Sequence, residues 1–222
     1  MKTRNKILLL TLTAALLVVA TVLGTLAWLT STEQVTNTFT VGSVEIKLDE
    51  ADVDEYGEAI SNADRVTGNH YRLLPGKSYT KDPTVTVTKG SEEAYLRMSV
   101  ILNNAAEWTA ILGSGDFLDY VDGWDNTKWE KVSRAVDATA NTITYEFRYY
   151  QTVGAVNATD DVTLEALFTS FAIPGEVTGE QLQTLSDFEI TVVANAIQTL
   201  GFADEDEAWA AFDRQMNGNV AP

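Results

Sequence analysis

Apolar and polar residues alternate in four stretches of the chain, and this alternation is the main guide to its structure. A period of two places one face of a strand in a core and the other face in solvent. Several short strands of this kind are typical of a β-sandwich. The alternating apolar residues are Val85 and Val87; Leu96, Met98, Val100 and Leu102; Ile143, Tyr145, Phe147 and Tyr149; and Phe188, Ile190, Val192 and Ala194.

The segments between these stretches are rich in Gly, Asn, Asp and Thr, which favour turns and loops. They include 113–116, 122–127 and 154–161. The sequence therefore predicts an antiparallel arrangement of short strands joined by polar loops.

Two helices are also expected, a short one near 179–185 and a clearer one over 205–216. The second has Asp204 as its N-cap, and Glu207 completes a capping box. Trp209, Phe212 and Met216 share one face of it, and such stripes normally face a core. We expect this face to pack that terminal helix onto the sheet.

The first residues follow the pattern of a secretory signal peptide. Three basic residues, Lys2, Arg4 and Lys6, precede an apolar run over 7–23, and Thr25 and Ala27 then supply small side chains for a signal peptidase. We expect cleavage after Ala27. The alternative is an uncleaved anchor, because the uncharged run over 7–29 reaches the ~20 residues that a membrane-spanning helix needs. Under both readings the rest of the chain lies outside the cytoplasm.

Composition limits what the exported part can be. Without residues 1–27 the chain has 195 residues, which suits one domain with a substantial core. Losing three basic residues takes the formal net charge from −17 to −20, and such a surface repels nucleic acid and anionic membranes. The absence of cysteine excludes disulfides and thiolate chemistry.

The apolar phase changes just after the expected signal. Val35, Phe39 and Val41 fall on odd positions, whereas Val44, Ile46 and Leu48 fall on even ones, so the alternation breaks at Gly42 and Ser43. A shift of one residue turns the apolar face of a strand over, which implies a bulge or two separately pairing segments. Residues 28–42 are therefore a candidate donor strand, and 43–222 the β domain.

An acidic cluster over 49–58 partly matches a calcium-binding loop. Asp52, Asp54 and Gly57 hold the first, third and sixth loop positions, but Tyr56 occupies the fifth and Ala63 stands where a bidentate Glu belongs. A hydrated acidic loop is the preferred interpretation. A metal held by carboxylates elsewhere is left open.

Four motifs in order resemble the TasA and camelysin family of exported Gram-positive proteins. They are GTLAWLTSTEQVTNTFTVGSVEIKL, RLLPGKSYTKDPTVTV, AYLRMSVILN and SDFEITVVANAIQTLGFADEDEAWAAF. The resemblance implies an all-β, jelly-roll-like antiparallel β-sandwich with short accessory helices and a C-terminal helix, preceded by a signal helix. It also implies export through a SipW-type signal peptidase, location at the cell surface or in the extracellular matrix, and assembly into biofilm fibres. In such fibres the N-terminal segment of one subunit, here with Val35, Phe39 and Val41, completes the sheet of the next or of a related subunit.

The same family includes proteins described as metalloendopeptidases, which is the first alternative function. Zinc hydrolysis needs about three protein ligands, and this chain offers one histidine, His70, and no HExxH motif. A Ser-His-Asp triad would need the same histidine. Glu146 in TITYEFRYY is expected to be a solvent-side strand residue rather than half of a glycosidase pair. We expect no catalytic residue, no metal ligand and no cofactor.

A carbohydrate-binding module is the second alternative, because jelly rolls often hold sugars on aromatic platforms. Four aromatic residues are candidates, and Trp124, in a turn-rich stretch, is the best of them. Packing in the core or under loops is the preferred interpretation for all four. The candidates are Trp108, Trp124, Trp129 and Tyr150.

Overall fold

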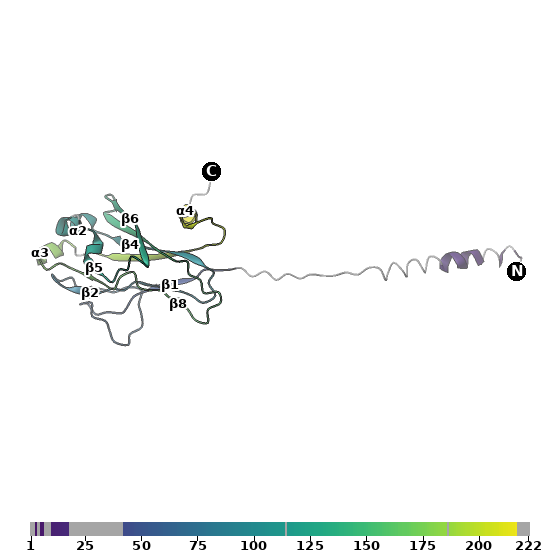
Figure 1. The fold of residues 1–222 in the computed structure, drawn as a ribbon, viewed down its shortest axis with the longest axis horizontal. Coiled ribbons are helices and arrows are strands. Elements are labelled where there is room, and N and C mark those ends of the chain that lie inside the picture. Colours follow the sequence, from purple (N-terminus) through teal and green to yellow (C-terminus); the bar gives the residue numbers. More distant parts are fainter. Residues whose placement is uncertain are drawn as a thin grey trace. The chain divides into compact units, whose positions relative to one another are not determined.

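The computed structural model describes residues 3, 5–6, 10–17, 42–113, 115–185 and 187–216. The chain divides into two compact units, Met1–Val41 and Gly42–Pro222. Within the described part of the first unit, residues 10–17 are helical, and the hydroxyl of Thr13 donates to the carbonyl of Leu10 over 3.1 Å (Figure 1). No helix among the described residues has both the length and the apolarity to cross a membrane. Thr25, Ala27, Val35, Phe39 and Val41 all lie outside the described residues.

The second unit is mostly β, as the alternation predicted. Its strands form three antiparallel sheets, with the orders β1-β3-β8, β10-β4-β7-β6 and β2-β9-β5. The strands are β1 (Ile46–Asp49), β2 (Ser78–Thr80), β3 (Thr84–Val87), β4 (Ala94–Leu102), β5 (Val121–Asp122), β6 (Trp129–Asp137), β7 (Thr142–Tyr149), β8 (Val162–Thr163), β9 (Ser170–Ala172) and β10 (Ile190–Gln198). The helices are α2 (Ala105–Leu112), the 3-10 turn η1 (Phe117–Tyr120), α3 (Gly179–Gln183) and α4 (Glu205–Met216).

The four-stranded sheet confirms the predicted strands and their faces. Val100 of β4 lies opposite Val192 of β10 on one side and Tyr145 of β7 on the other. Met98 and Phe147, two positions along, are fully buried, because every second side chain of these strands points into the core. Phe188, predicted as part of the last strand, lies just before β10 and stacks on the buried ring of Trp108.

The two three-stranded sheets are joined end to end by a short irregular region. Residues 81–83 separate β2 from β3, and a longer loop separates β8 from β9. Two hydrogen bonds bridge the gap: Lys81 N donates to Thr169 O over 3.1 Å, and Leu167 N donates to Pro83 O over 3.0 Å. Figure 1 shows β1, β2 and β8 forming one layer and β4 and β6 the other. The arrangement is consistent with an all-β sandwich.

The predicted C-terminal helix, α4, begins and ends where the sequence places it. The Asp204 carboxylate accepts from the N–H of Glu207 over 2.9 Å, while the Glu207 carboxylate accepts from the N–H of Ala203, one residue before the expected partner. Trp209 is fully buried and Phe212 half-buried. The prediction for Met216 is wrong, since its side chain is 68% exposed. The contacts of α4 with the sheet extend to Asp213, which pairs with Arg97 of β4, and Met216 lies beyond them.

Glu146 is not a free solvent-side residue. Its carboxylate pairs with Arg148 over 3.2 Å and with Arg97 over 3.5 Å, on the sheet face that α4 covers. Arg148 also pairs with Asp206 of α4 over 2.6 Å. Strand alternation placed Glu146 on the outer face correctly, but the later helix folds back over that face.

Candidate functional site

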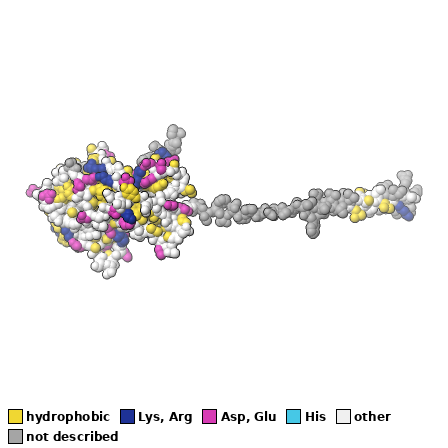
Figure 2. Space-filling model, viewed as in Figure 1, with side chains coloured by type: hydrophobic (Ala, Val, Ile, Leu, Met, Phe, Trp, Pro, Cys, Tyr) yellow, Lys and Arg dark blue, Asp and Glu magenta, His cyan; other side chains and the backbone are white. Residues whose placement is uncertain are grey.

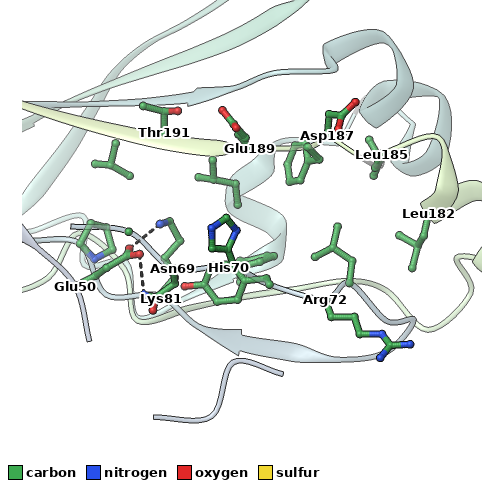
Figure 3. A pocket seen from close by; sticks show the side chains of 18 of the residues that line it. Glu50, Asn69, His70, Arg72, Lys81, Leu182, Leu185, Asp187, Glu189 and Thr191 are labelled. Carbon is green, nitrogen blue, oxygen red and sulfur yellow. Dashed lines mark hydrogen bonds and ion pairs between the residues drawn. The ribbon is translucent and has the colours of Figure 1, made fainter. Parts of the chain in front are cut away.

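A groove of about 950 Å³ runs along the edge of the four-stranded sheet. One wall is the start of β10 with the segment before it, and the opposite wall is residues 67–75 with the end of β1. Figure 3 shows Glu50, Asn69 and Lys81 together at one end and Leu182 and Leu185 towards the other. Much of the lining is apolar and half-buried, including Leu48, Tyr71, Leu73, Leu182, Phe188, Ile190 and Val192.

The β10 strand presents an unpaired backbone edge to this groove. The backbone groups of its odd-numbered residues are hydrogen-bonded to β4. Two bonds at the ends of the strand establish this phase: Glu189 O accepts from Asn103 N, and Thr199 N donates to Glu93 O. Backbone groups alternate in direction along an antiparallel strand, so those of the even residues point away from β4. No hydrogen bond within the described part of the chain reaches the backbone of Ile190, Val192, Ala194 or Ala196 on that side.

The two edges of the same sheet differ in how they resist pairing with another chain. At one edge, β6 carries four charged residues and an irregularity between Lys131 and Ser133. Charges and bulges are the usual protection of a sheet edge. At the other edge, β10 has nine residues with no charge, no proline and no register shift. An edge of that kind is suited to accept an added strand.

A buried cluster of three polar side chains forms one end of the groove. Lys81 Nζ lies 2.6 Å from Glu50 Oε2, and Asn69 Nδ2 donates to Glu50 Oε1 over 2.9 Å. Glu50 and Lys81 are 5% and 7% exposed. The expectation of a fully hydrated acidic loop over 49–58 is therefore wrong at Glu50, because the long loop after β1 folds back and covers it.

Two more carboxylates of the acidic cluster, those of Asp49 and Asp54, also have protein partners. Asp49 pairs with Arg65, whose guanidinium also bonds to Asp82 over 2.9 Å. The Asp54 carboxylate accepts from the N–H groups of Tyr56 and Glu58, which closes a turn. These carboxylates are occupied in holding the loop.

His70 is exposed, and in Figure 3 its ring stands in the groove between its own segment and β10. Within the residues that the structure describes, no three His, Asp or Glu side chains are grouped so that they could hold a metal ion. His70 therefore lines the groove without a set of neighbouring ligands.

The four aromatic candidates for a sugar platform fall in different places. Trp108 and Trp129 are buried in the core, at 2% and 0% exposure. Trp124 is half-buried, donates from its indole N–H to Trp129 O over 2.9 Å, and meets Phe147 edge to face. Tyr150 alone of the four is exposed. Core or loop packing is confirmed for the three tryptophans.

Gly42 and Ser43 begin the described part of the domain. Ser43 O accepts from Glu92 N over 2.9 Å, and Val44, Ile46 and Leu48 are half-buried, as the even phase predicts. A Cβ on Gly42 would lie 2.7 Å from the exposed Glu92 side chain, which would have to move to accommodate it. The odd-phase half of the predicted break lies outside the described residues.

On the face of the domain in Figure 2, acidic and basic side chains are interspersed among uncharged ones, and the chain as a whole has 32 acidic and 15 basic residues. Eight of the basic residues are engaged in ion pairs within the domain. Any second copy that binds must therefore approach at a place where repulsion between carboxylates is small. The uncharged β10 edge is such a place.

Two features of the site were missed by sequence reasoning. Lys81 lay in a stretch noted only for its turn, and Asn69 lay next to the histidine that drew attention. Their link to Glu50 depends on pairing across many residues, which periodicity does not encode. The uncharged composition of β10 was visible in the sequence and could have identified it as an unprotected edge.

Comparison with known proteins adds no relative: no family model, no curated protein and no solved structure matches this chain.

Proposed function

We propose that this protein is an exported structural subunit of the cell surface or extracellular matrix, which associates with other copies by strand addition at β10. The observation that carries the proposal is the uncharged backbone edge of β10, which has no partner among the described residues and whose first residues lie beside a groove with apolar and polar parts. Strand addition obtains affinity from backbone hydrogen bonds and specificity from pockets for alternate side chains. The resemblance to the TasA and camelysin family supports the same function.

The finer fold that we propose is a jelly roll, a double Greek key of eight strands. Taking β2 with β3, and β8 with β9, as one broken strand each gives eight strands in chain order. The second strand (β2 with β3) then pairs with the seventh (β8 with β9), and the third (β4) pairs with the sixth (β7). The eighth strand (β10) lies on the other side of the third. This nested antiparallel pairing supports a jelly roll. There are two departures: the fifth strand, β6, pairs with β7 rather than with the fourth strand, β5, and the first strand, β1, pairs with β3 rather than with the eighth strand, β10.

The proposed donor is the segment 28–41 of another copy. It carries a single charged residue, Glu33, in a chain with 32 acidic residues, so its insertion adds little repulsion. Val35, Phe39 and Val41 alternate with polar residues and would face the apolar lining of the groove. Export would be directed by residues 1–27, cleaved by a SipW-type peptidase, with membrane contact limited to that segment before cleavage.

The test compares matched lysine substitutions on the two edge strands. Val193 of β10 and Val136 of β6 are both exposed, at 40% and 56%, so lysine at either adds the same charge without filling the core. Lysine on an edge strand opposes pairing with another chain. Electron microscopy and light scattering of the mature protein should show filaments for the unaltered chain and for Val136→Lys, and monomers for Val193→Lys. Equal loss in both variants, or equal assembly, would overturn the assignment to β10.

A further inference from the structure

The buried cluster of Lys81, Glu50 and Asn69 has the components of an amide-forming site. It contains a primary amine, a carboxamide and a carboxylate that bonds to both: Glu50 Oε2 holds the amine at 2.6 Å, and Glu50 Oε1 holds the amide nitrogen at 2.9 Å. A buried lysine is a common covalent nucleophile once a neighbouring base can take its proton. We propose that Lys81 and Asn69 form an intramolecular isopeptide bond, with Glu50 as the general acid and base.

The carboxamide is held in place by hydrogen bonds at both of its ends. Its oxygen, Asn69 Oδ1, accepts from the backbone N–H of Val53 over 3.0 Å, and its nitrogen also donates to Ala51 O over 2.8 Å. The Val53 N–H polarises the carbonyl and stabilises the negative charge that develops on oxygen in the tetrahedral intermediate. These bonds also fix which atom of the amide is the oxygen and which the leaving nitrogen.

The step balances without any further reagent. One proton moves from Lys81 Nζ to Glu50, and the free amine attacks Asn69 Cγ to form the Nζ–Cγ bond. The Cγ–Nδ2 bond then breaks, and Glu50 returns the proton to the departing nitrogen, which leaves as ammonia. Nζ gives up a second proton through Glu50 to this ammonia, so that a neutral amide and an ammonium ion remain. An ammonium and a carboxamide become a secondary amide and an ammonium ion, with no change of oxidation state. The cluster lies at the end of the groove, which gives ammonia a path to solvent.

The position of the cluster gives the bond a structural role. Lys81 lies in the break between β2 and β3, where its backbone N–H donates to the backbone carbonyl of Thr169. Asn69 lies in the long excursion between β1 and β2, whose backbone hydrogen bonds are mostly formed within the excursion itself. A covalent link would fix this excursion to the sheet in a chain that has no cysteine. The inference does not depend on strand addition.

Mass spectrometry of the full chain tests the inference. The unaltered protein should be lighter than the mass of its sequence by one ammonia, about 17 Da. Variants with the same N-terminus that cannot form the bond provide the reference. Lys81→Arg keeps a cation beside Glu50 but cannot form the amide, and Glu50→Gln keeps both reactants but removes the base. Both variants should have the mass of their sequence.

Peptide mapping and melting give independent readouts. Trypsin should leave 66–72 joined to 78–89, because an acylated Lys81 is not cut; both variants should release 66–72 and 78–81 separately. The unaltered protein should melt about 5–10 °C above Lys81→Arg, as expected for closing a loop of this length in a domain of this size. Circular dichroism verifies that the variants fold. An unaltered protein with its full sequence mass and a free 78–81 peptide would overturn the proposal.

Discussion

The guanidinium carbon of Arg97 lies 4.4 Å from the centroid of the Trp209 ring, so a strand residue on the outer face of the sheet is covered by the C-terminal helix. Arg97 also lies 5.2 Å from the Phe212 ring and bonds to both oxygens of Asp213, over 2.8 and 3.3 Å. Its Nε is buried without a hydrogen-bond partner among the described residues. The arginine therefore connects α4 to the sheet through stacking and a two-pronged ion pair.

Replacing Arg97 with alanine should release α4. The variant loses a charge-assisted pair and a cation–π contact, which together stabilise the docked helix by about 2–4 kcal/mol. Chemical unfolding should show that loss, and limited proteolysis should cut the segment 199–216 first. Arg72→Ala is the control, since its exposed guanidinium has no hydrogen bond or ion pair within the described residues, and it should leave both measurements nearly unchanged. Equal effects of the two substitutions would contradict the role of Arg97.

Acid should weaken the same contact. The side-chain hydrogen bond and charge of Arg97 hold the pKa of Asp213 below its usual value. A carboxyl group with a lowered folded pKa stabilises the fold above its unfolded pKa, about 3.9, and that contribution is lost as the pH falls through the lower folded pKa. Arg148, Glu146, Glu205 and Asp206 face the same interface.

We therefore expect α4 to be docked at neutral pH and to separate from the sheet below about pH 4. The near-ultraviolet circular dichroism of Trp209 reports the change, with Trp209→Phe supplying the background from the other tryptophans. Asp213→Asn has no carboxyl group at this position to take up a proton, so its circular dichroism signal should change less steeply with pH. A transition that is the same in both proteins would show that Asp213 is not part of it.

The sequence predicted the parts of this fold in which local pattern decides the structure. Strands β4, β7 and β10 follow from period-two burial, and α4 follows from capping by Asp204. Glu146 and Met216 were misjudged because their surroundings depend on where α4 folds back. Helix periodicity fixes the direction of Met216 around the helix axis but not how far along the helix the sheet extends.

The candidate site could be predicted only in part, for the same physical reason. An uncharged edge strand is visible in the composition of β10, although its place at the edge is a property of the sheet order. The contact of Glu50 with Lys81 joins residues 31 positions apart, and Asn69 reaches Glu50 from 19 positions away. No periodicity connects them, because the loop between β1 and β2 has no regular element to impose one.

The mature protein should begin at Trp28. Thr25 and Ala27 are the small residues nearest the end of the apolar run, and signal peptidases select small side chains at the last and third-last positions before the cut. N-terminal sequencing of the exported protein measures this directly. Ala27→Phe should block processing and retain residues 1–27 on a membrane-associated product. A membrane-bound natural protein that still carries these residues would show that they act as an anchor.

Purified protein should not hydrolyse casein or peptides in a zinc-dependent manner. His70 is the one histidine in the chain and there is no cysteine, whereas a hydrolytic zinc site needs about three protein ligands and usually two or more histidines. The assay compares the protein with and without added zinc, a chelator, and His70→Ala. Activity that zinc restores and His70→Ala abolishes would contradict the prediction.

The strongest test of assembly is the donor segment itself, and Phe39 should contribute most to it. Among Val35, Phe39 and Val41 it offers the largest apolar area, and loss of a buried phenylalanine typically costs about 3–5 kcal/mol. That cost lowers the affinity between subunits by about two to four orders of magnitude. Phe39→Asp, or deletion of 28–41, should therefore leave a folded monomer under conditions in which the mature protein forms filaments. Thr38→Asp is the matched control, because it adds the same charge on the opposite face of the segment. A truncated protein that still forms filaments would rule out the donor strand. Circular dichroism shows whether the truncated protein folds, and failure to fold would show that the segment belongs to its own domain.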